Sequence, residues 1–413
     1  MFKSEKTYKI LVLVLFIALA VSLPLYKKLS LSFVWLILLL WLAEGNFKEK
    51  YKRFVSTGNV FVRAAFLLLP LLYLAGVFYS ANLDQAMFRI EQKASLLLIP
   101  IVLFSFHPVI KTKEFFIKIM YSFIFGIITA GMICLIRAFL RYQETGSLLV
   151  FYYSEFSMFH HPGYFALYAA VAVAGLLYII DCCWKRYNIL IKSFLISALL
   201  LILVFTFLLS SKAGILSVLI VFAVAFLVIV VVRKKYLFAL IAILALIILI
   251  LAGTMIFSFA GDRFLKNSLT EKNMEASPDG VGVRLTVWKS SLSVIKKYPL
   301  FGVGTGDFKD VMAKEYLRSA PVMQKVGFRN AHNQFLETTV TLGITGGIAL
   351  MLWLLVPFRL AFHKNHYFYL SFLLVIFFNF LVESMLETQS GIMFIVFMHT
   401  WFFVISDNID IRW

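Results

Sequence analysis

The chain has 413 residues, of which 62% are hydrophobic and only 15% are charged. A typical soluble domain is roughly 45–50% apolar and about 25% charged, so the composition excludes an ordinary water-soluble fold. The formal net charge of +18 does not indicate a nucleic-acid binder, because Lys and Arg occur in short clusters between apolar runs. We therefore expect a single membrane domain over residues 1–413.

Apolar runs of about the length that crosses a bilayer, roughly 20 residues, recur along the chain. We predict an all-α polytopic membrane protein with about twelve spans, near residues 10–26, 30–44, 60–80, 94–107, 115–137, 163–182, 191–210, 213–232, 236–259, 336–358, 367–383 and 389–406. The first run is interpreted as a retained helix, because it lacks a small-residue cleavage site. The fourth run is short and follows a predicted amphipathic helix at 82–93, so ten or eleven spans is the alternative.

The distribution of Lys and Arg between alternate loops predicts the orientation of the spans. With the N-terminus in the cytoplasm, the inner loops hold 20 basic residues and the short outer loops hold 7. This excess follows the positive-inside rule and predicts that both termini are cytoplasmic. The remaining 12 basic residues lie in the long loop 260–335, between the ninth and tenth spans, on the predicted outer side. Loops longer than about 60 residues escape the charge rule, and long loops usually carry function.

Within this loop, residues 282–297 have the apolar spacing of a helix that lies at the membrane surface. Arg284 on this helix is suited to hold a pyrophosphate through paired hydrogen bonds, and the alternative is that it only reaches lipid headgroups. Gly302, Gly304 and Gly306 follow at alternate positions. They predict either a phosphate-binding turn or a structural turn that packs the loop onto the helices.

Polar residues also cluster at the mouth of the tenth span. His332 lies where the positive end of a helix dipole disfavours the imidazolium, so a neutral ring could accept a proton there. Asn333 and Glu337 are four residues apart and share a helix face, which would let Glu337 orient neighbouring polar groups. The alternative is that His332 is an interfacial residue that only caps the helix.

Other polar groups fall on the same predicted side of the membrane. Lys212 lies in a tight hairpin between two apolar spans, where a cation suggests an anionic substrate or, alternatively, simple snorkelling. The start of the sixth span and the last outer turn hold His160, His161, Tyr164, Glu383, Glu387 and Gln389. This convergence predicts an outward-facing cavity lined by cations, a histidine and carboxylates. The three cysteines have no zinc-like or disulfide-like spacing, and no metal or cofactor is expected.

Several of these motifs together resemble a known family. The motifs are Arg284 to Trp288, Pro299-Leu300-Phe301-Gly302-Val303-Gly304, Ala331-His332-Asn333, Leu336-Glu337 and Leu342-Gly343. Their order and spacing are similar to the hallmark segment of the O-antigen ligase and polymerase superfamily. The resemblance implies a metal-independent, C-type glycosyltransferase of the bacterial inner membrane, with its active site at the periplasmic face and a glycan on undecaprenyl pyrophosphate as donor.

By position in the family motif, Arg284 would bind the donor's pyrophosphate and His332 would deprotonate or orient the acceptor hydroxyl. Lys212 stands where similar ligases have an arginine, which keeps the charge but loses bidentate geometry. Asn333, Glu337, His161 and Glu387 are the further candidates for substrate binding.

The first functional hypothesis is ligation of an O-antigen to lipid A-core. Alternatives in the same superfamily are a repeat-unit polymerase and a protein O-oligosaccharyltransferase. A polymerase is less favoured because such enzymes often have two substantial outer loops. A transporter or flippase of lipid-linked sugars is the alternative from a different class, and it would be expected to show internal repeats. The expected partners are the lipid-linked glycan, a glycan or protein acceptor and membrane lipids, with no nucleic acid.

Overall fold

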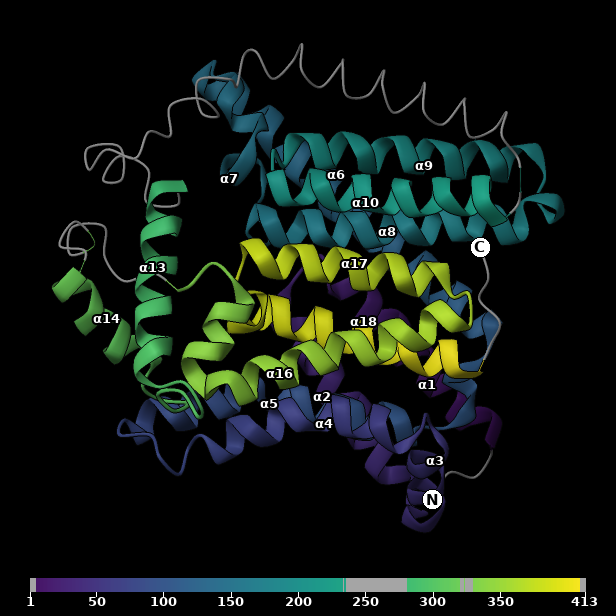
Figure 1. Ribbon diagram of the computed structural model, residues 1–413. Helices are drawn as coiled ribbons and strands as arrows, with labels where there is room; N and C mark the ends of the chain where they lie inside the picture. The colour runs from purple at the N-terminus through teal and green to yellow at the C-terminus, as the bar shows by residue number, and fades with distance from the viewer. Residues whose placement is uncertain (1–4, 233, 235–280, 320–322, 324–329, 409–413) are drawn as a thin grey trace.

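The computed structural model describes residues 5–232, 234, 281–319, 323 and 330–408, and these residues form helices and connecting turns. The α-helices are α1 Glu5–Ser22, α2 Lys27–Glu44, α3 Phe47–Ser56, α4 Val60–Ala75, α5 Leu83–Ser105, α6 Lys113–Thr145, α7 Tyr153–Phe156, α8 Pro162–Cys183, α9 Ile189–Leu208, α10 Lys212–Leu227, α13 Val281–Lys297, α14 Phe308–Ser319, α16 Gln334–His363, α17 Tyr367–Val382 and α18 Gln389–Asn408. The long helices run side by side between two ends of a bundle (Figure 1). The predicted all-α class is thus confirmed for the described residues.

Six described helices are long and apolar enough to cross a membrane: α6, α8, α9, α10, α16 and α18. The pair α2 and α3 would add a seventh if the two were one span, although they meet at a bend of 115°. Helices α4 and α17 are apolar but shorter. The chain is therefore a polytopic membrane protein, whereas the predicted count of about twelve spans is not confirmed. The predicted span at 236–259 lies outside the described residues.

At α5, the entry helix predicted at 82–93 and the short run predicted at 94–107 form one continuous helix, Leu83–Ser105. Asn82 caps this helix by accepting a hydrogen bond from the backbone N–H of Gln85. The charge of Lys93, in the middle of the helix, is neutralised inside the bundle by Glu387 at 2.6 Å.

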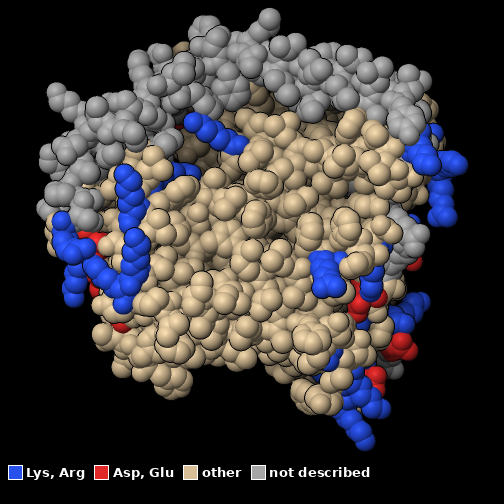
Figure 2. All heavy atoms as spheres, viewed as in Figure 1, with Lys and Arg blue, Asp and Glu red and all other residues tan. Residues whose placement is uncertain are grey.

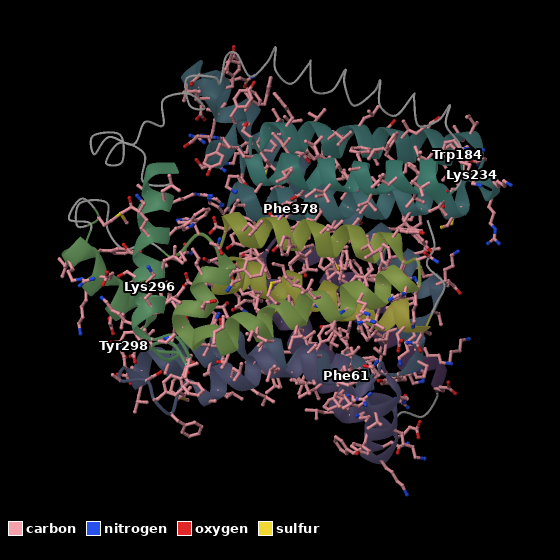
Figure 3. All side chains as sticks on the ribbon, viewed as in Figure 1. Phe61, Trp184, Lys234, Lys296, Tyr298 and Phe378 are labelled. Atoms are coloured by element: carbon pink, nitrogen blue, oxygen red, sulfur yellow. The ribbon has the colours of Figure 1, made fainter. Side chains whose placement is uncertain are left out.

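The two ends of the bundle differ in what they carry. At one end, the backbone N–H of Gly58 and the ammonium of Lys364 both bind Asp407, each at 2.8 Å. Helices α13 and α14 lie across the opposite end (Figure 1). Lys296 and Tyr298 mark this end, and Lys234 and Trp184 mark the other (Figure 3). The predicted helix at 282–297 is confirmed as α13.

Charged side chains follow the same division. Figure 2 shows Lys and Arg gathered mainly toward the two ends, with a broad band of uncharged surface between them. Such a band is expected where acyl chains of a bilayer surround the protein, because charges there are costly.

Helices α8 and α18 form the centre of the bundle, since 78% and 89% of their apolar windows are buried. Small residues permit this close packing: a Cβ at Gly214 of α10 would lie only 2.2 Å from the Cβ of Ala166 on α8. The first turns of α8 and α10 therefore meet at the end of the bundle that carries α13.

Candidate functional site

A kink in α16 shapes the floor of the site. Gly343 has φ +67° and ψ −165°, which interrupts the helix. The carbonyls of Val340 and Thr341 accept instead from the backbone N–H groups of Val303 and Gly304, both at 3.0 Å. The glycine turn predicted after α13 is therefore joined to α16 by backbone hydrogen bonds.

The same turn has no room for side chains at its tightest point. Gly302 has φ +70°, and a Cβ there would lie 2.4 Å from the backbone nitrogen of Gly343. The next N–H groups of the turn are also occupied: Thr305 donates to the carbonyl of Gly76, and Gly306 donates to the hydroxyl of Ser80. Because these donors are committed to the protein, the geometry favours the structural turn over a phosphate-binding turn.

His332 lies just before α16 in a conformation that is uncommon for a residue with a side chain, with φ +43°. Three contacts hold this conformation. The N–H of Ala331 donates to Glu337 at 2.7 Å, its carbonyl accepts from the indole of Trp288 at 2.9 Å, and the N–H of His332 donates to Asn330 at 3.1 Å. Backbone strain of this kind is concentrated at functional sites.

Asn333 and Glu337 are committed to protein partners. The side chain of Asn333 caps α16 at Leu336 and donates to the carbonyl of Leu381 at 3.1 Å. The hydroxyl of Ser384 donates to Glu337 at 3.3 Å and accepts from the backbone N–H of Asn333 at 3.2 Å. Both residues are buried. They orient the His332 segment and the segment after α17, whereas their predicted contact with substrate stays a prediction.

Two of the predicted site residues meet at Glu383, the residue that follows α17. The Nδ1 atom of His332 lies 3.2 Å from Oε2 of Glu383, and Nη2 of Arg284 lies 3.9 Å from the same oxygen. Arg284 also donates to the carbonyl of Val382 at 2.8 Å. Helix α13, the start of α16 and the end of α17 therefore bring Arg284, His332 and Glu383 together, and we call these three residues the reactive cluster.

The charge state of Glu383 follows from these neighbours. Burial alone would raise the pKa of its carboxyl, but the hydrogen bond with His332 and the nearby charges of His332, Arg284 and His161 lower the pKa below its ordinary value. The carboxylate is therefore ionised at neutral pH and accepts a hydrogen bond. In a neutral imidazole, the proton then resides on Nδ1 of His332 and the lone pair on Nε2. This carboxylate partner was missed by the assignment of site residues from the sequence.

Two nitrogen atoms of the reactive cluster have open hydrogen-bonding capacity. His332 Nε2 and Arg284 Nε are buried and have no hydrogen-bond partner among the described residues. Other buried side-chain atoms of the described residues share this state, and these two are distinguished by lying on neighbouring basic side chains that meet at one carboxylate. A cavity of about 80 Å³ lies elsewhere, between α2, α5 and α18, and it is lined by neither residue. The predicted outward-facing cavity stays a prediction.

Glu387 has a different environment from the one predicted for a substrate ligand. Its carboxylate is bound by Arg89 at 2.5 Å, by Lys93 at 2.6 Å and by the side chain of Gln334 at 3.3 Å. We call Arg89, Lys93 and Glu387 the anchor cluster. The structure thus surrounds Glu387 with protein donors from α5 and α16. The sequence signal for the anchor cluster is the spacing of Arg89 and Lys93, which are four residues apart and therefore share one face of a helix.

His161 and Lys212 lie at the starts of adjacent helices. The ring of His161 caps α8 by accepting from the N–H of Gly163 at 3.3 Å. Lys212 is the first residue of α10 and is exposed. The two residues therefore begin helices that pack together, and their predicted contact with substrate stays a prediction.

Comparison with known proteins finds a family match and a relative. Residues 197–351 match the family model described as O-antigen ligase. The match covers less than half of the chain, and it shows that this segment is similar to O-antigen ligases. The matched segment contains Lys212, Arg284, His332, Asn333 and Glu337. The O-antigen ligase segment ends before α17, so Glu383 and the anchor cluster lie outside it.

The chain is also similar to an uncharacterised protein of Haemophilus influenzae. The two are 33% identical over 90 residues, which spans 22% of this chain and 22% of that relative. Among the described residues, no group of three or more His, Cys, Asp or Glu side chains is arranged to hold a metal ion.

Proposed function

We propose that the protein is a membrane glycosyltransferase that moves a glycan from undecaprenyl pyrophosphate to an acceptor hydroxyl, with O-antigen ligation to lipid A-core as its reaction. The observation that carries this proposal is the reactive cluster. It combines a histidine held by a carboxylate, an adjacent guanidinium and two nitrogen atoms that have no partner in the part of the chain that the structure describes. The O-antigen ligase match, which includes Arg284 and His332 but not Glu383, supports the reaction class.

In the proposed reaction, Nε2 of His332 takes the proton of the acceptor hydroxyl as its oxygen bonds to the anomeric carbon of the donor sugar. The bond from that carbon to the pyrophosphate oxygen breaks, and the electron pair leaves with the lipid pyrophosphate. Glu383 stabilises the imidazolium that forms, and it holds the ring so that Nε2 faces the hydroxyl. Arg284 offsets the negative charge on the departing phosphate.

The proposed location is the bacterial inner membrane, with both termini in the cytoplasm and the reactive cluster at the periplasmic face. The support is the excess of 20 over 7 basic residues in the loops assigned to the cytoplasm. His161 and Lys212, at the starts of α8 and α10, are proposed to contact the anionic donor beside Arg284.

Replacement of His332 with alanine tests the proposal in cells. We expect His332→Ala to remain in the membrane at the wild-type level while lipopolysaccharide loses its long chains, because the base is gone. His363→Ala is the matched control, since His363 is exposed at the far end of the same helix. Gel analysis of lipopolysaccharide reads the outcome, and normal long chains in His332→Ala would overturn the role of His332.

The acceptor is identified with purified protein and an undecaprenyl-pyrophosphate glycan, without metal or nucleotide. Transfer to lipid A-core is the expected result. Extension of a second carrier-linked glycan would assign a polymerase instead, and transfer to a peptide hydroxyl would assign a protein O-oligosaccharyltransferase. Movement of the lipid-linked glycan across a vesicle membrane without any transfer would assign a flippase.

A further inference from the structure

The turn between α17 and α18 is held by residues far away in sequence. It carries Glu383 at its start and Glu387 four residues later. The ammonium of Lys93 on α5 donates to the carbonyl of Leu386 at 2.8 Å and to the carboxylate of Glu387 at 2.6 Å. It also lies 4.5 Å from the centre of the Tyr73 ring. Lys93 is therefore enclosed by partners, and its side chain is only 3% exposed.

The rest of the turn is held just as firmly. Gln334 accepts from the N–H of Leu386 at 2.6 Å, and Gln92 donates to the carbonyl of Glu387 at 3.0 Å. A Cβ at Gly391 would lie 1.9 Å from the carbonyl oxygen of Met385, so α18 approaches the turn as closely as a glycine permits. These contacts hold the turn at Leu386 and Glu387, within four residues of Glu383.

The segment around α4 and α5 also holds the glycine turn. Asp307 accepts from the backbone N–H groups of Ala81 and Asn82, at 2.7 and 2.8 Å. The hydroxyl of Thr305 donates to the carbonyl of Tyr73 at 2.7 Å. Residues 73–93 thus hold two segments that flank the reactive cluster, and they lie outside the matched family segment.

We propose that Lys93 is a positioning residue for the transfer reaction, acting through Glu387 to place Glu383 against His332. This inference rests on the proposed function. The hydrogen bond from His332 to Glu383 is 3.2 Å long, at the upper limit for N–H to O bonds, so a small outward shift of Glu383 breaks it. Removal of Lys93 leaves Glu387 with Arg89 and Gln334 as its side-chain partners and frees the carbonyl of Leu386. We therefore expect the turn to relax toward Arg89 and away from His332.

Steady-state kinetics with the purified full-length protein test this role. In Lys93→Met we expect kcat to fall about ten- to a hundredfold, as for small misplacements of catalytic groups, with KM for the donor within about twofold. Lys93→Arg keeps the cation and should recover part of the loss. Lys118→Met is the control, because Lys118 pairs with Glu114 on the exposed surface of α6.

A double-mutant cycle separates positioning from general destabilisation. If Lys93 acts through Glu383, Lys93→Met should lower kcat by less than about twofold in a Glu383→Gln background, because the bond it supports is already lost. Equal loss in both backgrounds overturns the proposal, and so does a Lys93→Met enzyme with wild-type kcat. If Lys93→Met does not reach the membrane, Glu387→Gln, which keeps the shape of the side chain, takes its place. An inactive wild-type enzyme would instead overturn the proposed function.

Discussion

The contact between His332 and Glu383 yields the sharpest prediction about the site. Glu383→Gln keeps the size of the side chain but removes its charge. A hydrogen bond to a charged group contributes roughly 1.5–3 kcal/mol, so its loss alone slows the reaction about ten- to 150-fold. The amide of glutamine can also donate to Nδ1 of His332, which places the ring proton on Nε2 and removes the base. We therefore expect kcat to fall into the upper part of the roughly 10²–10⁴-fold range of general base catalysis.

The loss is measured as the rate of glycan transfer from an undecaprenyl-pyrophosphate donor, by the wild type and by Glu383→Gln, between pH 6 and about 8. The pKa of Glu383 lies below its ordinary value, so the wild-type carboxylate stays charged throughout and pH does not mimic the substitution. Glu383→Asp restores the charge on a shorter side chain, and it should retain more activity than Glu383→Gln. If Glu383→Gln turns over within about threefold of the wild type, the carboxylate does not hold His332 and the proposed mechanism is wrong.

Two further predictions concern the stability of the loop that carries Arg284. Gly302→Ala should destabilise the protein by at least about 2 kcal/mol and lower its Tm in detergent, because a side chain is strained at φ +70° and clashes with Gly343; an unchanged Tm would contradict the packing described. Contacts with Lys297, Arg318 and a serine hydroxyl outweigh the effect of burial and lower the pKa of Glu315 to about 2. This stabilisation is present above pH 4.5 and is lost as pH falls toward 2, so the protection of α13 amides, relative to their intrinsic exchange rate at each pH, should fall over that window in the wild type but not in Glu315→Gln.

The helices could be predicted from the sequence because uninterrupted apolar runs leave the backbone little alternative in a membrane. The predicted run at 191–210 is Ile189–Leu208 in the structure, and the run at 367–383 is Tyr367–Val382. At α5, the sequence predicts the helix but not the partner of Arg89 and Lys93. Local pattern does not show that a carboxylate about 300 residues later neutralises them, at separations of 298 and 294 residues.

The candidate site was predicted in part for the same reason. Arg284 and His332 stand in recognisable motifs, and the structure brings both to Glu383. The role of Glu383 could not be predicted, because 51 residues separate it from His332 and only the packing of α16 against α17 sets which carboxylate meets the ring. Likewise, the sequence gives no φ angle, so the fit of Gly302 against the kink at Gly343 followed only from the structure.

Charge alone does not separate a reactive group from a structural one in this fold. The reactive cluster and the anchor cluster each contain one carboxylate and two basic side chains, and both include residues of the turn after α17. They differ in how far their hydrogen-bonding capacity is filled. Lys93 and Glu387 are closed off by protein partners, whereas His332 and Arg284 each keep a buried nitrogen without a described partner. The proposed transferase reaction needs both arrangements. The paired side chains of the anchor cluster fix the geometry of the turn, and the nitrogen atoms of His332 and Arg284 that have no described partner remain for the substrate.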